Sequence, residues 1–135
     1  MVMNRPQLWV STAFITCVLA IGICYWTIPY SLLTLPDALG GAGLFAIGMA
    51  AFMLCVYGVA RFWTITFVLA ASVPAAVCAR VVVDGFKYPA SHNLWPLEVM
   101  IAMGLGLLCA LPGSLAGNLL AKIMRPGLKN KPARS

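Results

Sequence analysis

Four long apolar stretches, separated by short polar segments, dominate the chain. They cover residues 8–29, 39–60, 62–83 and 95–124. An α-helix rises about 1.5 Å per residue, so about 20 apolar residues cross the hydrocarbon core of a bilayer, which is about 30 Å thick. All four stretches reach that length. The pattern therefore predicts an all-α membrane protein, a single domain built as an antiparallel bundle of four transmembrane helices.

The lengths of the stretches and of their connections refine this picture. Residues 95–124 would measure about 45 Å as a straight helix, so we expect this helix to tilt or to kink at Pro112-Gly113. Only Ala60-Arg61 separates the second stretch from the third, which predicts a tight hairpin. The connection 84–94 is the one with substantial polar content.

Composition excludes most alternatives to a membrane protein. Apolar residues make up 62% of the chain and charged residues 9%, whereas soluble domains average about 45–50% and about 25%. So few charges cannot cover a soluble domain of this size. The five cysteines all fall within the apolar stretches and show no C-x-x-C spacing, so we expect them to pack as small apolar residues. We predict no disulfide, metal or cofactor.

The basic residues predict the orientation in the membrane. Because cytoplasmic flanks are enriched in Lys and Arg, the side with more of them should face the cytoplasm. One side holds seven of the nine: Arg5, Arg61, Lys122, Arg125, Lys129, Lys131 and Arg134. Arg80 and Lys87 lie on the other side. Both termini are thus expected in the cytoplasm, with a short basic tail over 125–135, in a bacterial inner membrane. The net charge of +6 then reflects topology and attraction to anionic lipid, not nucleic-acid binding.

The remaining polar residues gather at the opposite boundary, in a group that we call the polar cluster: Arg80, Asp84, His92, Asn93 and Glu98. Arg80 and Asp84 are four residues apart and share a helix face. Glu98 lies one turn inside the fourth helix and needs a partner there.

Three interpretations of the polar cluster are open. Arg80 could simply neutralise Asp84 or Glu98, the cluster could bind a lipid headgroup or a small solute, or it could be catalytic. One histidine and two carboxylates are too few for a typical zinc site, and no nucleophile motif or phosphate loop accompanies them. The sequence therefore favours a protein that is not an enzyme, and we assign no catalytic residue.

Glycines in the fourth stretch predict close helix packing. Gly113 and Gly117 form a G-x-x-x-G pair, and Gly106 precedes them by two turns. Small residues allow helix backbones to approach each other in a membrane. This packing could occur within one chain or could join two chains through the fourth helix.

In length and number of spans the chain resembles the small multidrug resistance transporters and the small dimeric fluoride channels. The resemblance covers architecture only, because the first stretch lacks the acidic residue of those transporters and no pore-lining pattern is visible. We predict a small non-enzymatic membrane protein that acts as a homo-oligomer or as an accessory subunit of a larger membrane complex. The alternative is a transporter or channel for a small solute or lipid headgroup that uses the polar cluster.

Overall fold

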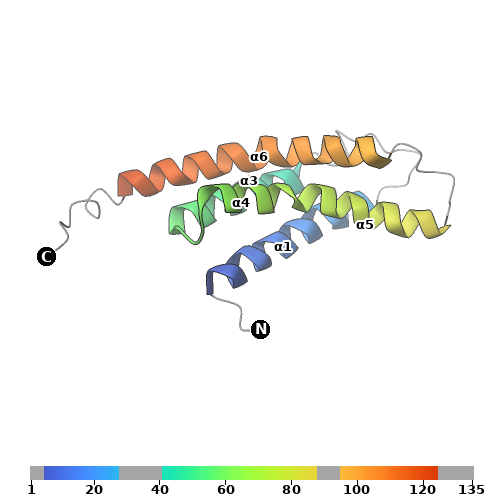
Figure 1. Cartoon of the computed structure of the whole chain (residues 1–135), viewed down its shortest axis with the longest axis horizontal. Helices are drawn as coiled ribbons and strands as arrows, with labels where there is room; N and C mark the ends of the chain where they lie inside the picture. Colours follow the sequence, from blue (N-terminus) through green and yellow to red (C-terminus); the bar gives the residue numbers. More distant parts are fainter. Residues whose placement is uncertain (1–4, 28–40, 88–94, 125–135) are drawn as a thin grey trace, which may run out of the picture.

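Helices make up the structure of the chain. The computed structural model describes residues 5–27, 41–87 and 95–124. Its elements are α1 (Arg5–Thr27), α3 (Ala42–Tyr57), α4 (Phe62–Ala70), α5 (Ser72–Lys87) and α6 (Trp95–Met124). They extend along one long axis, and these ranges contain no strand (Figure 1). The prediction of an all-α fold is confirmed for the described residues.

Among the described residues, three helical stretches are long and apolar enough to cross a membrane, namely Arg5–Thr27, Phe62–Val83 and Trp95–Met124. The fourth apolar helix, α3, has 16 residues. At about 1.5 Å per residue it measures about 24 Å, somewhat less than a bilayer core. The described helix is therefore shorter at both ends than the predicted stretch 39–60.

A left-handed glycine ends α3 and starts the turn into α4. Gly58 has φ 65° and ψ 35°, a conformation that glycine adopts without steric cost. The Gly58 N–H donates to the Cys55 carbonyl and the Val59 N–H to the Leu54 carbonyl, both at 3.1 Å. This pair of bonds is the Schellman motif. It allows residues 58–61 alone to connect two antiparallel helices.

The third apolar stretch, predicted as one helix over 62–83, is divided at Ala71 into α4 and α5. Pro74 has no N–H, so the carbonyl of Ala70 loses its helical donor. The Ser72 hydroxyl donates to the neighbouring Leu69 carbonyl at 2.6 Å, which satisfies a second carbonyl at the break. Beyond it, α5 continues to Lys87, so the start of the predicted polar connection 84–94 is helical.

In contrast, α6 runs through Pro112 as one helix of 30 residues. The structure shows no break at Pro112-Gly113, and Figure 1 shows α6 as one continuous helix; the kink expected there stays a prediction. Contacts on both sides of the proline account for this, because Gly106 packs on Ala70 and Gly117 packs on Phe52. Tertiary packing thus holds the helix together where the local sequence would weaken it.

Alanines share the interior with branched aliphatic residues such as Ile47, Ile65 and Leu69, and large apolar residues cover the exterior. Ala51, Ala70, Ala76, Ala102 and Ala110 have no exposed surface. Many large side chains point outward instead, among them Trp9, Phe45, Trp63, Phe86, Met100 and Leu108. Apolar surface on this scale is unusual for a monomer in water.

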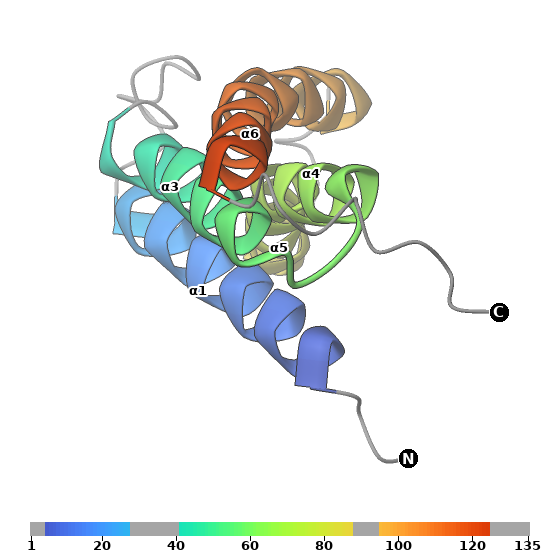
Figure 2. The same ribbon diagram turned by 90° about the vertical axis from the view of Figure 1, so that its left-hand side faces the viewer.

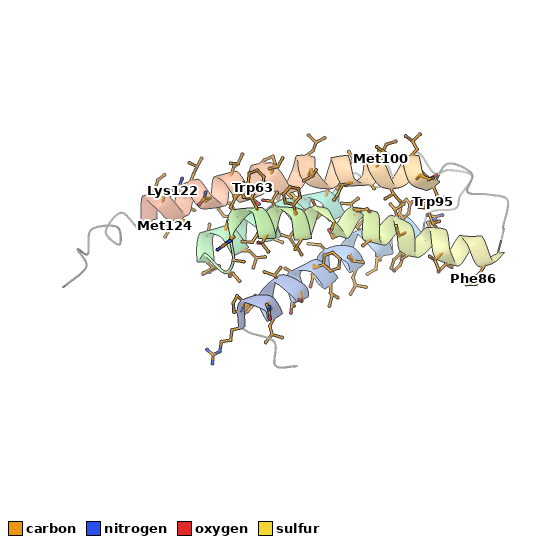
Figure 3. All side chains as sticks on the ribbon, in the orientation of Figure 1. Trp63, Phe86, Trp95, Met100, Lys122 and Met124 are labelled. Atoms are coloured by element: carbon orange, nitrogen blue, oxygen red, sulfur yellow. The ribbon has the colours of Figure 1, made fainter. Side chains whose placement is uncertain are left out.

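The two ends of the bundle carry different charged residues. Figure 1 shows the start of α1, the α3–α4 turn and the end of α6 at one end. This basic end carries Arg5, Arg61 and Lys122. The end of α5 and the start of α6, with Glu98 in its first turn, form the opposite end (Figure 1). Figure 3 shows Lys122 and Met124 at one end and Phe86 and Trp95 at the other.

Candidate functional site

Arg80 is the one buried charged side chain among the described residues, with 9% of its surface exposed. Its guanidinium donates a hydrogen bond to the main-chain carbonyl of Tyr25. The same group lies over the Tyr25 ring, 4.7 Å from the ring centroid. Tyr25 is itself buried. Arg80 therefore joins α5 to the last turn of α1 through a charge-assisted hydrogen bond and a cation–π contact.

The Tyr25 carbonyl is available because of the sequence that follows it. In a helix it would accept a hydrogen bond from the N–H of residue 29, and residue 29 is a proline, which has none. Arg80 supplies the donor that Pro29 cannot. A cation is also favourable at the negative, C-terminal end of the α1 dipole. Arg80 thus acts as the C-terminal cap of α1, provided from another helix.

A second hydrogen bond joins the same two helices. The Trp26 Nε1–H donates to the carbonyl of Ala76 on α5 at 3.2 Å. Arg80 and Trp26 therefore form a reciprocal pair, in which each helix gives one side chain to a carbonyl of the other. This pair fixes the end of α1 against α5.

The structure describes only some of the other members of the polar cluster. Glu98 lies in the first turn of α6 and is partly buried, at the same end of the bundle as Arg80. Asp84 follows Arg80 by one turn on α5. His92 and Asn93 lie outside the described residues. One partner of Arg80 is Tyr25, which sequence reasoning did not identify; convergence of the whole polar cluster stays a prediction.

Three glycines hold α6 directly against the backbones of its neighbours, and Figure 2 shows α6 lying over α3 and α4. A Cβ atom at Gly113 would lie 2.2 Å from the carbonyl oxygen of Gly48. At Gly117 it would lie 2.4 Å from that of Phe52, and at Gly106 2.3 Å from that of Ala70. The G-x-x-x-G face is thus used within the chain, and association of two chains through α6 would need another face.

Gly106 also closes the break between α4 and α5. The carbonyl that it approaches belongs to Ala70, the group that Pro74 leaves without a donor. A glycine Cα–H next to a carbonyl oxygen is a weak hydrogen-bond donor. The backbone of α6 therefore lies against the Ala70 carbonyl, next to the break between α4 and α5.

A small polar contact joins α3, α4 and α6 inside the bundle. The Thr66 hydroxyl lies 2.9 Å from the Ser114 hydroxyl and 2.9 Å from the Phe62 carbonyl. The Ser114 side chain also forms a hydrogen bond with Cys55. Thr66 and Ser114 have no exposed surface. Sequence reasoning missed this contact; the available signal was two hydroxyl residues inside otherwise apolar stretches.

Within the described ranges no three His, Cys, Asp or Glu side chains come together in a way that could hold a metal ion. The guanidinium of Arg80 binds the Tyr25 carbonyl, and the Thr66 hydroxyl lies within hydrogen-bond distance of the Ser114 hydroxyl and of the Phe62 carbonyl. The arrangement is suited to holding helices together.

Comparison with known proteins adds no family: no protein-family model matches the chain, and no curated protein or solved structure is significantly similar to it.

Proposed function

We propose that the chain is a small integral membrane protein of four spanning helices with no catalytic role. It acts as a homo-oligomer or as an accessory subunit of a larger membrane complex. The apolar exterior supports the membrane placement, because hydrocarbon is the solvent in which exposed Trp, Phe, Met and Leu side chains carry no penalty.

One observation supports the proposal that the protein neither catalyses a reaction nor transports a solute. Gly113 and Gly117 bring the backbone of α6 into contact with that of α3, and Gly106 does the same at the α4–α5 break. Backbones in contact leave no space between these helices for a solute or for a water-filled path. A bundle closed in this way is suited to presenting its outer surface to other proteins.

The charge distribution supports an orientation with both termini in the cytoplasm. Arg5, Arg61 and Lys122 lie at one end of the bundle, together with the start of α1 and the end of α6 (Figure 1). By the positive-inside rule this end faces the cytoplasm. The end with Arg80 and Glu98 then faces the exterior.

A transporter or channel is the second candidate, and the divided helix favours it. Interrupted helices form the binding sites of many transporters, where unwound carbonyls line a cavity. Here, however, the free carbonyl at the break is covered by Gly106. The buried charge nearest to a possible path, Arg80, already binds Tyr25. Both observations favour the closed bundle.

The experiment is a measurement of mass in a lipid environment, before and after purification. A homo-oligomer should show an integral multiple of the chain mass, larger than one, in lipid nanodiscs. An accessory subunit should instead be monomeric after purification but migrate with a larger complex when native membranes are solubilised gently. A monomer under both conditions would contradict the proposal.

A further inference from the structure

The two faces of α6 carry different kinds of residue. The face that packs inside the bundle holds small residues, among them Gly106, Ser114 and Gly117. The opposite face points away from α3 and α4, over which α6 lies (Figure 2). It carries a row of residues that we call the outer stripe, namely Ile101, Leu108, Leu111, Leu115 and Asn118.

The outer stripe has the spacing of helices that pair along their length. Its successive members from Leu108 onward alternate between steps of three and four residues, and Ile101 precedes Leu108 by seven. This heptad repeat keeps one apolar row in contact with a second helix. The remaining position, Gly104, contributes no side chain. Leu108 is 69% exposed and Leu115 51%, so the row is open to a partner.

Asn118 distinguishes the outer stripe from an ordinary lipid-facing surface. Its partly buried side chain carries two N–H donors and one carbonyl acceptor. No hydrogen bond joins this amide to another described residue, whereas the hydroxyls of Thr12 and Thr66 donate to carbonyls of their own helices. Asn118 lies within the apolar stretch 95–124, where an amide without a partner is costly. It therefore needs a partner from outside the described residues.

We propose that the outer stripe pairs α6 with α6 of a second copy of this chain. The inference rests on the homo-oligomeric form of the proposed function. Two copies with the same orientation in the membrane are related by a two-fold axis, so their α6 helices run parallel and each residue near the axis meets its counterpart. An amide both donates and accepts, so the two copies of Asn118 can exchange hydrogen bonds. A lipid chain would leave the amide unpaired.

The rest of α6 is compatible with this pairing. Lys122 follows Asn118 by one turn and is exposed. It lies at the basic end, where its long side chain can extend to the headgroups, so pairing does not bury its charge. The contacts of Gly106, Gly113 and Gly117 lie on the opposite face of the helix, so pairing leaves the bundle intact.

The test is the dissociation constant of the dimer, measured by sedimentation equilibrium of the full-length chain in mild detergent. Asn118→Leu should weaken the dimer about tenfold, the effect of one interhelical amide contact in a membrane. Asn118→Gln keeps the amide and should recover most of this loss. Leu108→Ala should also weaken the dimer. Leu19→Ala, the matched control, removes an exposed leucine from α1 and should change the constant by no more than about twofold. Circular dichroism checks that each variant keeps its helices.

Three results would overturn the inference. Unchanged dimers of Asn118→Leu and Leu108→Ala would show that the copies associate through another face, and the homo-oligomeric proposal would stand without this contact. Equal weakening by Leu108→Ala and Leu19→Ala would show that apolar side chains act without a defined interface. A wild-type chain that is monomeric in detergent and in lipid nanodiscs would overturn the pairing and the homo-oligomer together, and would leave the accessory subunit.

Discussion

Replacing Gly113 by alanine should destabilise the protein by about 3 kcal/mol, because overpacking at a site that cannot yield costs in this range. The new Cβ would lie 2.2 Å from the Gly48 carbonyl oxygen. A main-chain group cannot rotate away as a side chain can, so α6 has to move off α3. The measurement is the thermal midpoint of the chain in detergent, together with the rate at which a maleimide labels Cys55. Cys55 is buried in the wild type, and it should become reactive in the variant.

Gly104 is the matched control on the same helix. A Cβ there would meet nothing within 4 Å. Alanine is the better helix former by up to about 1 kcal/mol, so Gly104→Ala should leave the midpoint unchanged or raise it. If Gly113→Ala and Gly104→Ala gave the same midpoint and the same labelling of Cys55, the close contact between α6 and α3 would be refuted.

Replacing Arg80 by alanine should have the second largest effect, a loss of about 3 kcal/mol. The variant removes a charge-assisted hydrogen bond and leaves the buried Tyr25 carbonyl without the donor that Pro29 cannot supply. The cation–π contact with the Tyr25 ring is lost as well. The end of α1 should then separate from α5. The thermal midpoint measures the stability, and protease sensitivity near the end of α1 reports the local change.

Two variants make this prediction specific. Arg61→Ala removes an exposed arginine at the basic end and should shift stability by no more than about 0.5 kcal/mol. Arg80→Lys keeps the charge and one donor, so it should recover part of the loss. Equal midpoints for Arg80→Ala and Arg61→Ala would show that the contact with Tyr25 contributes nothing to the fold.

The lengths of the apolar stretches were enough to predict most of the helices. The fourth stretch, 95–124, has the bounds of α6, because a helix in an apolar solvent continues until polar residues begin. Prolines were harder to interpret. Pro74 accompanies a break and Pro112 does not, although both remove one backbone donor. The difference lies in what packs on either side, and that information is distant in the sequence.

Arg80 was singled out from the sequence, but its contacts with Tyr25 were not predicted. Because Arg80 and Asp84 carry opposite charges and lie four residues apart, the sequence suggested an ion pair between Arg80 and an acidic residue. The partner that the structure adds is a main-chain carbonyl of another helix, 55 residues away, and no pattern of side-chain types reveals a carbonyl. Pro29, four residues after Tyr25, was the usable signal. The Thr66–Ser114 contact spans 48 residues and could not be read from local spacing.

Labelling of one added thiol at each end of the bundle tests the central claim, that the helices cross a membrane with the basic end in the cytoplasm. Phe86→Cys and Lys122→Cys place these thiols at opposite ends (Figure 3), and the unmodified chain gives the background from its own cysteines. An impermeant maleimide applied to intact cells should add one label to Phe86→Cys and none to Lys122→Cys; after permeabilisation both should react. Labelling of Lys122→Cys in intact cells would contradict the account.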